Sequence, residues 1–403
     1  MSLMVDKNCM KMKIRDVENA FRYRRIPYPK RSVELIALIA ISCTFFLFMH
    51  TKNLNTRLRE MEVKLQPSEF SALGLTGEHH ISGGGDGSRS GNDINTLHGT
   101  YQYLKSTGQL QSLSADTLNN TKHSNPNIVF FNRAAKVGSE ALMELILILK
   151  RFNDFQFKLN PKTQQHLELS KIQGIAEEIS DLPDGTFFME HMSFINFTQF
   201  GYVQPIYINM VRDPVERVIS WFFYARSGYR NAIRFMRQPN DEIKGLDWWK
   251  KDFNKCVRNR DPECVFEQYS LLDKNIDFRR QSLFFCGQST DCLPFNSPAA
   301  VQIAKHNVEK YYAVVGSWED TNVTLSVLEK FIPRYFNGAK LIFDIHKEKI
   351  MNRNRNKRKP KVYEDVKEMI RRNFTQEYEF YHFCKQRLYK QYISIKLKEL
   401  IDL

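Results

Sequence analysis

A lysine in a loop of small residues is the first feature of the sequence that can do chemistry. Lys136 lies in segment 133–139, between the apolar, β-forming residues 128–132 and the mostly apolar, predicted helix 140–149. Such a strand–loop–helix unit places backbone N–H groups and a helix N-terminus beside an anion. The loop is therefore a candidate phosphate site, with a simply solvated lysine as the alternative. The full pattern G-x-x-x-x-G-K-[ST] is absent, which argues against an ordinary ATPase or GTPase.

A second strand–loop–helix unit follows later in the chain. Residues 206–211 are a predicted buried strand. Asp213 fits a helix N-cap, Pro214 suits the first helical position, and Glu216 completes a capping-box pattern. Helical spacing continues through Arg226. Because strands alternate with helices, we expect an α/β domain with a parallel sheet.

Arg212 and Ser220 are candidates for binding a further phosphate. Arg212 stands where the second strand ends, and Ser220 lies about two helical turns later. An arginine fork and a hydroxyl can share one phosphate group. In the structural alternative, Arg212 pairs with Asp213 or Glu216, and Ser220 packs within its helix. Taken with the Lys136 loop, this unit indicates a nucleotide that carries phosphates at two separated ends.

The N-terminal region indicates a membrane anchor. Residues 1–31 carry nine Lys or Arg against three acidic residues, and residues 33–49 are largely apolar and uncharged except for Glu34. Residues 32–50 are therefore predicted to be a transmembrane signal-anchor with a cytoplasmic tail at 1–31, in the type II orientation. A cleaved signal peptide and a buried core helix are the alternatives. Because so short a span suits a thin bilayer, we expect a Golgi membrane protein with its catalytic domain in the lumen.

The rest of the chain divides into a linker and one large domain. Residues 51–126 are predicted to be a flexible lumenal stem, since residues 82–88 are a low-complexity stretch rich in Gly and Ser. Residues 127–403 are the predicted catalytic domain, whose folded part begins near Asn127 and ends at about Tyr392. The net charge of +14 indicates a polyanionic partner, but charge alone does not distinguish nucleic acid, membrane and acidic polysaccharide.

The seven cysteines agree with a lumenal domain. Cys256 precedes Cys264 by eight residues, and Cys286 precedes Cys292 by six. Two close pairs in an oxidising compartment indicate two local disulfides. Zinc ligation is the alternative, although the sequence has no C-x-x-C. Four sequons permit glycosylation, at Asn119, Asn196, Asn322 and Asn373.

Several segments resemble one family of enzymes. Residues 132–139 look like the 5′-phosphosulfate loop of sulfotransferases that use the donor PAPS, and residues 207–220 look like their 3′-phosphate motif. Within that family the chain is similar to the heparan sulfate and uronyl 2-O-sulfotransferases, most closely to the insect Pipe branch. The resemblance runs in order over residues 127–392. Further matching segments are 190–197, 256–259, 283–287, 292–297 and 312–320.

The resemblance implies a fold, a reaction and a set of site residues. The fold is a P-loop-like, three-layer α/β sandwich with a central parallel sheet. The reaction moves a sulfuryl group from PAPS to a 2-hydroxyl of a uronic acid in a glycosaminoglycan or related glycan. His191 is implied to be the general base for the attacking hydroxyl, and Lys136 to stabilise the leaving phosphate. The residues implied to contact the donor are Arg133, Lys136, Val137, Gly138, Ser139, Glu140, Arg212, Ser220, Arg353 and Asn354.

The same resemblance bears on cofactors and partners. It implies PAPS as co-substrate, PAP as product and no metal. It implies a glycan polyanion as acceptor, with no nucleic acid, and a homotrimer.

Two positions depart from the heparan-acting pattern. Ala135 replaces the proline often found before the loop lysine, and Met189 stands where the heparan enzymes have a second histidine. These departures leave the acceptor open, so another hydroxyl or a glycoprotein glycan is an alternative. A Golgi glycosyltransferase shares the topology, but the sequence has no Asp-x-Asp motif. A non-catalytic glycan-binding protein is a further alternative. The presence of Lys136, His191, Arg212 and Ser220 together argues against it.

The predicted orientation can be checked on intact Golgi vesicles. Because residues 1–31 should be cytoplasmic and the catalytic domain lumenal, protease added outside the vesicles should remove only the tail. Immunoblotting with an antibody against the catalytic domain measures this. Loss of that domain before detergent is added would contradict the type II orientation.

Overall fold

The computed structural model describes residues 94–402, apart from residues 165–166, 238–242, 272–278 and 353–358. The predicted tail, the predicted transmembrane anchor and most of the predicted stem lie outside the described residues. Within the described ranges, no helix is both long enough and apolar enough to cross a membrane.

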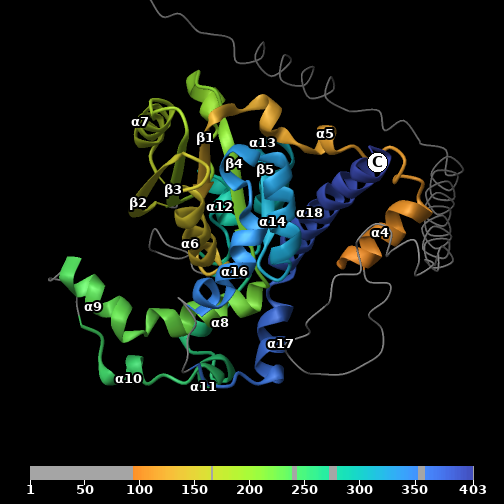
Figure 1. The fold of residues 1–403 in the computed structure, drawn as a ribbon. Helices are drawn as coiled ribbons and strands as arrows, with labels where there is room; N and C mark the ends of the chain where they lie inside the picture. The colour runs from red at the N-terminus through yellow and green to blue at the C-terminus, as the bar shows by residue number, and fades with distance from the viewer. Residues whose placement is uncertain (1–93, 165–166, 238–242, 272–278, 353–358, 403) are drawn as a thin grey trace, which may run out of the picture. The chain divides into compact units, whose positions relative to one another are not determined.

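The described residues contain a sheet of five parallel strands in the order β2-β3-β1-β4-β5 (Figure 1). This confirms the predicted parallel sheet and both predicted strands. The strands are β1 Asn125–Asn132, β2 Gln156–Gln164, β3 Thr186–Met192, β4 Pro205–Val211 and β5 Tyr312–Ser317.

Helices connect and cover these strands. The α-helices are α4 Leu97–Ser106, α5 Ala115–Leu118, α6 Ser139–Leu149, α7 Leu169–Ser180, α8 Pro214–Ala225, α9 Gly228–Arg237, α10 Leu246–Trp249, α11 Phe253–Arg258, α12 Leu283–Cys286, α13 Pro298–Tyr311, α14 Thr321–Phe331, α15 Pro333–Phe336, α16 Ala339–Asn352, α17 Glu364–Arg372 and α18 Thr375–Ile401. The 3-10 helices are η1 Asn120–His123, η2 Phe197–Phe200, η3 Pro262–Cys264 and η4 Thr290–Cys292.

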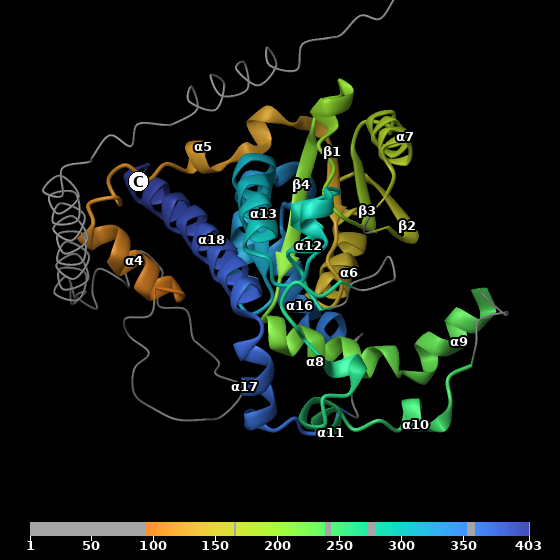
Figure 2. The same ribbon diagram turned by 180° about the vertical axis from the view of Figure 1, so that it is seen from behind.

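The sheet is the middle layer of three. Helices α6 and α16 pack together on one face, and α12 and α13 pack together on the other (Figures 1 and 2). Because helices cover both faces, every residue of β4 and β5 is buried. Aromatic rings join neighbouring strands inside this core. The ring of Phe130 lies 5.3 Å from that of Phe188 and 5.1 Å from that of Tyr207.

The folded region begins earlier than the predicted boundary at Asn127. Helix α4 packs against α18, where Tyr101 and Leu104 are buried together with Ile393. The Asn120 side chain donates to the carbonyl oxygen of Tyr312 in β5 at 2.9 Å. Residues 97–124 are therefore part of the domain and not of a flexible stem. The reason is long-range, because the apolar side chains of α4 find their partner almost 300 residues later in the chain.

Both predicted disulfides are present, Cys256–Cys264 and Cys286–Cys292. The four sequon asparagines lie at the surface to different degrees: Asn322 and Asn373 are exposed, whereas Asn119 and Asn196 are partly buried. Their glycosylation stays a prediction.

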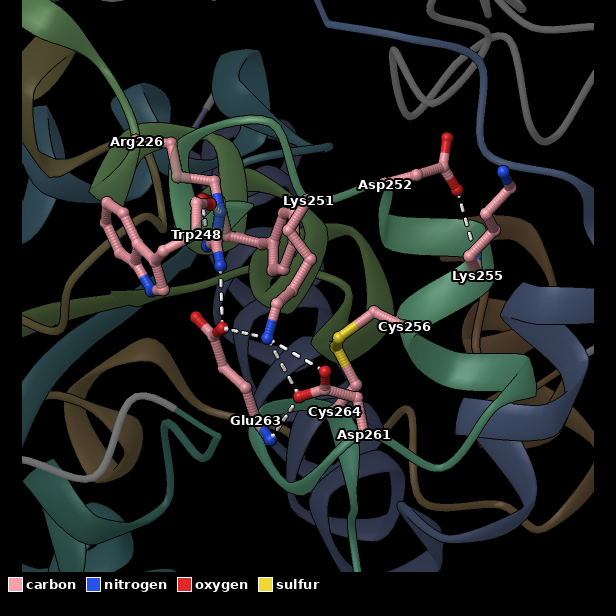
Figure 3. Close-up of a disulfide and its surroundings, with 10 residues drawn as sticks. Arg226, Trp248, Lys251, Asp252, Lys255, Cys256, Asp261, Glu263 and Cys264 are labelled. Carbon is pink, nitrogen blue, oxygen red and sulfur yellow. Dashed lines mark hydrogen bonds and ion pairs between the residues drawn. A yellow bond between two sulfur atoms is a disulfide. The ribbon is translucent and has the colours of Figure 1, made fainter. Parts of the chain in front are cut away.

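The first disulfide loop is tied to the end of α8 by an ion-pair network (Figure 3). Lys251 Nζ lies 2.8 Å from Asp261 and 3.3 Å from Glu263, and Arg226 lies 2.6 Å from Glu263. The Arg226 guanidinium also stacks 4.3 Å from the ring centroid of Trp248. The network is partly buried and joins several charges, so it restrains this end of α8 more firmly than an isolated surface pair would. The other end of α8 carries the predicted phosphate motif.

Candidate active site

The predicted site residues lie at the carboxyl ends of three parallel strands, at one edge of the sheet. Loop 133–139 follows β1, His191 lies near the end of β3, and Arg212 follows β4. Strands β1 and β4 are neighbours, yet β1 connects towards one side of the sheet and β4 towards the other. In parallel α/β sheets, such a reversal point is where ligands bind. The fold therefore brings the predicted site residues, which are far apart in the sequence, to the same edge of the sheet.

A buried polar network fixes the start of loop 133–139. The Asn209 side chain donates to Asn132 O at 2.6 Å and accepts from the backbone N–H of Ala134 at 3.2 Å. The hydroxyl of Tyr312 donates to Asn132 Oδ1 at 3.0 Å. Asn132 Nδ2 donates in turn to Phe284 O at 2.9 Å. This network was not predicted, although Asn132 and Asn209 are polar residues inside two apolar strand patterns and were a usable signal.

Two arginine side chains contact backbone carbonyl oxygens of loop 133–139. Arg217, which is buried on α8, donates to Ala135 O at 3.2 Å. Arg212 Nη1 lies 3.4 Å from Lys136 O, at the long end of hydrogen bonding. Lys136 has a φ of +65°, in the left-handed region that is costly for a residue with a side chain. The surrounding contacts impose this conformation, as is common at functional sites.

The loop leads into a helix start that is suited to an anion. Gly138 is the N-cap of α6 with a φ of +87°, and none of the described side chains caps this helix. The Ser139 hydroxyl donates back to Ala134 O at 3.2 Å. The indole of Trp318 packs so closely on Gly138 that a Cβ atom there would lie 1.9 Å from Trp318 Cε3. Val137 is fully buried and anchors the loop in the core, so it contributes to any ligand site through its backbone.

Positive charges converge beside this loop. Burial, together with the charges of Arg212 and Arg230 and against the opposing charge of Glu140, lowers the pKa of Lys136 to about 8. Lys136 Nζ lies 4.0 Å from the ring centroid of Tyr224. Cations that lower one another's proton affinity are stabilised by an added anion.

The arginine side chains at the site retain unused donors. The Nε atoms of Arg133 and Arg212 are buried and make no hydrogen bond to the described residues. A buried donor without a partner is costly in a native protein and points to a missing acceptor. Together with the cationic loop, these donors favour a ligand that carries several anionic oxygens.

His191 has the geometry and charge state of a general base. Its Nδ1 lies 2.9 Å from Arg133 O. A carbonyl oxygen only accepts, so Nδ1 carries the proton and Nε2 keeps a free lone pair. Burial, reinforced by the charge of Arg133, lowers the pKa of His191 to about 3. The imidazole is therefore neutral across physiological pH, with Nε2 unprotonated.

The Arg133 and Glu140 side chains pair with each other. Arg133 Nη1 lies 2.7 Å from Glu140 Oε1, with Arg133 almost buried. Both were predicted to contact a donor directly. Those contacts stay predictions, and the ion pair restrains the residue whose carbonyl oxygen orients His191.

The start of α8 differs from the predicted capping box. Asp213 accepts from the N–H of Glu216 at 2.8 Å, as predicted. Glu216, however, is bound by Lys359 at 3.2 Å and Lys367 at 3.0 Å, and Glu319 accepts from the N–H of Asp213 in its place. Two lysines attract the carboxylate more strongly than a single N–H does.

The structure describes only some of the other residues predicted to contact PAPS. Arg212 Nη2 lies 4.0 Å from Glu216, so this structural alternative holds only at the limit of an ion pair. Ser220 is partly buried on α8. Arg353 and Asn354 lie outside the described residues. In the described ranges, no group of three or more His, Cys, Asp or Glu is placed to hold a metal ion.

Comparison with known proteins gives consistent matches. Residues 120–384 match the sulfotransferase family. The chain is 43% identical to the uronyl 2-sulfotransferase homolog pip of Drosophila melanogaster, over 98% of this chain and 95% of that protein. It is 31% identical to the uronyl 2-sulfotransferase of Homo sapiens, over 66% of this chain and 63% of the relative. It is 28% identical to heparan sulfate 2-O-sulfotransferase 1 of Homo sapiens, over 64% of this chain and 70% of that protein.

Two glycines provide a matched test of the close packing at the loop. Gly138 and Gly201 both have positive φ, but only Gly138 has Trp318 against it; a Cβ at Gly201 would meet nothing within 4 Å. Gly201→Ala should cost roughly 1–2 kcal/mol of unfolding free energy for its backbone conformation. Gly138→Ala should cost about 1–3 kcal/mol more because of overpacking. Denaturant unfolding measures both losses of unfolding free energy. Equal losses would contradict the close packing of Trp318 on Gly138.

Proposed function

This chain belongs to the sulfotransferase family and is a carbohydrate sulfotransferase, and from that premise we propose how and on what it acts. We propose that it transfers a sulfuryl group from PAPS to the 2-hydroxyl of a uronic acid in a glycosaminoglycan or related glycan. The observation that carries the proposal is the neutral His191, held beside a cationic loop at the carboxyl edge of the sheet.

The proposed donor site uses the two ends of the cationic edge. The 5′-phosphosulfate is placed against loop 133–139 and the uncapped start of α6. The 3′-phosphate is placed against Arg212, which directly precedes the N-cap of α8, and against Ser220 on that helix. The buried Nε atoms of Arg133 and Arg212 support this placement, because anionic oxygens would satisfy them. Arg353 and Asn354 stay predictions from the family resemblance, although Lys359 brings the nearby chain to Glu216 beside Arg212.

The proposed chemical step follows from the charge states. His191 Nε2 takes the proton of the sugar hydroxyl as that oxygen attacks the sulfur atom. The bond from sulfur to the 5′-phosphate oxygen breaks, and the electron pair remains on PAP. Lys136 stabilises the negative charge that develops on this leaving oxygen. The carbonyl oxygen of Arg133 stabilises the imidazolium through Nδ1–H, as a positioning partner of a histidine base does.

Donor binding should also prepare the base. Burial is the main cause of the lowered pKa of His191, and the positive charge of Arg133 is the second cause. An anionic donor offsets that charge, so the pKa of His191 rises towards its ordinary value when the donor is bound. The histidine then accepts a proton more readily than it does in the free protein, which favours reaction after the donor has bound.

We also propose the compartment. The basic residues 1–31 and the apolar residues 33–49 support a type II Golgi membrane protein. The two disulfides support an oxidising lumen for the catalytic domain. A homotrimer remains an expectation from the family resemblance.

Lys136 gives donor binding a defined pH dependence. Its pKa is lowered to about 8, and the ammonium form favours an anion. PAP affinity should therefore fall as the pH rises through 8, approaching about ten-fold per pH unit above it. Lys136→Arg keeps its charge over this range and should bind PAP without the decline. Calorimetric titration between about pH 7.5 and 9.5 measures both proteins. The same decline in the arginine variant would show that another group is responsible.

Sulfate transfer by the secreted lumenal domain tests the function and the base together. With labelled PAPS and a panel of desulfated glycans, the wild type should label uronic acid at the 2-position, as disaccharide analysis would show. His191→Ala should lose about 10²–10⁴-fold in turnover, because a positioned base contributes that much.

PAP affinity and the thermal midpoint serve as controls for that variant. Both should stay near wild type in His191→Ala, since the imidazole makes no proposed contact with the nucleotide. Near-normal turnover by the folded variant would remove His191 from the mechanism. Label on other hydroxyls or on glycoprotein glycans would overturn the proposed acceptor and keep the proposed donor.

A further inference from the structure

A buried glutamine holds both backbone polar groups of Arg212. Gln281 is fully buried. Its Nε2 donates to Arg212 O at 2.8 Å, and its Oε1 accepts from Arg212 N–H at 3.0 Å. Only one orientation of the amide satisfies both bonds, so the donor and acceptor ends of this side chain are fixed by their partners. The paired bonds resemble those of a neighbouring strand residue.

Arg212 needs such a partner because regular sheet pairing ends just before it. The β4–β5 pairing ends at Val211, opposite Ser317, and Val211 O then accepts from the N–H of Trp318 at 2.9 Å. The side-chain amide of Gln281 therefore continues the hydrogen bonding of β4 by one residue, at the point where α8 is about to begin.

Gln281 is itself held in place by a carboxylate from α18. Its backbone N–H donates to Glu377 Oε2 at 2.9 Å, and the Ser282 N–H donates to the same oxygen at 3.3 Å. The Ser282 hydroxyl donates to Glu377 Oε1. Glu377 is almost completely buried. A chain of hydrogen bonds thus runs from α18 through Glu377 and Gln281 to the backbone of Arg212.

The Arg212 side chain has little else to direct it. Its Nη1 contact with Lys136 O is 3.4 Å, its Nη2 contact with Glu216 is 4.0 Å, and its Nε makes no hydrogen bond to the described residues. The direction of the guanidinium therefore depends chiefly on how its backbone is held.

From this geometry we infer that Gln281 is a positioning residue of the donor site: it aims Arg212 at the 3′-phosphate of the nucleotide. The inference rests on the proposed use of PAPS. The competing explanation is that Gln281 merely fastens residues 281–286 to the sheet edge. In that case its loss would lower stability without acting through Arg212.

Gln204 offers a matched control. It is also buried, and its side chain likewise accepts from the Phe197 N–H at 3.0 Å and donates to Ile195 O at 3.2 Å. It lies just before β4, at the opposite end of the strand from Arg212. Gln204→Met therefore removes the same kind of bridge far from the donor site.

The experiment is a double-mutant cycle on PAP affinity, with thermal midpoints recorded for every protein. Arg212→Ala should weaken binding by roughly 10- to 150-fold, the range for a hydrogen bond to a charged group. Gln281→Met should weaken it by about ten-fold or more, and the double variant should bind no worse than Arg212→Ala alone, since residues that act as one unit are not additive. Gln204→Met should lose stability and bind PAP like the wild type.

Each outcome decides the matter. Wild-type affinity in Gln281→Met, or additive losses in the double variant, would overturn the positioning role. If Gln281→Met does not fold, Gln281→Asn carries the test, because its shorter amide cannot reach both groups of Arg212. Absence of PAP binding by the wild type would instead overturn the proposed function, and the inference with it.

Discussion

The carboxyl edge of this sheet depends on a pair of asparagine side chains that bridge two buried strands. Asn132 and Asn209 lie in β1 and β4, in a core that is mostly apolar and aromatic. Their amides satisfy each other, the first N–H of the loop and the hydroxyl of Tyr312. A buried polar network is stabilising only when every member is satisfied, so this one specifies a single arrangement. The loop that carries Lys136 departs from the sheet in a fixed direction for that reason.

Repulsion between positive charges destabilises the site in the free protein and favours a complex with an anion. The site gathers Arg133, Lys136 and Arg212, and Glu140 in the first turn of α6 pairs with Arg133. Each cation costs free energy beside the others, and burial adds to the cost. The fold supplies this energy from elsewhere, through the packed sheet and through clamps such as the ion pairs beside the Cys256–Cys264 disulfide. The proposed polyanionic nucleotide would offset this repulsion, which favours its binding over that of an uncharged ligand.

Local patterns in the sequence predicted the elements that local physics controls. The strands β1 and β4, the helix start at Asp213 and the two short-range disulfides follow from neighbouring residues, and the structure has them. Contacts between distant residues could not be predicted in this way. Glu319 replaces Glu216 at the N–H of Asp213, and α4 packs on α18, because partners far along the chain compete for the same groups. The proposed roles of His191 and Lys136 come from the family resemblance, because one histidine or one loop lysine has no local pattern that distinguishes a catalytic residue from a solvated one.

Helix α18 gives this domain a particular order of assembly. It follows every strand in the chain, yet Glu377 holds Gln281, the Tyr378 hydroxyl donates to Asp213, and the Tyr381 hydroxyl donates to Glu319. While the chain is being synthesised, the edge of the sheet emerges long before the residues that complete it. The nascent domain therefore carries its cationic loops without their buttress until residues 375–401 have been made. Completion of the proposed nucleotide site is thus coupled to the synthesis of residues 375–401, and a chain interrupted before them would carry the site residues without the contacts that hold them in place.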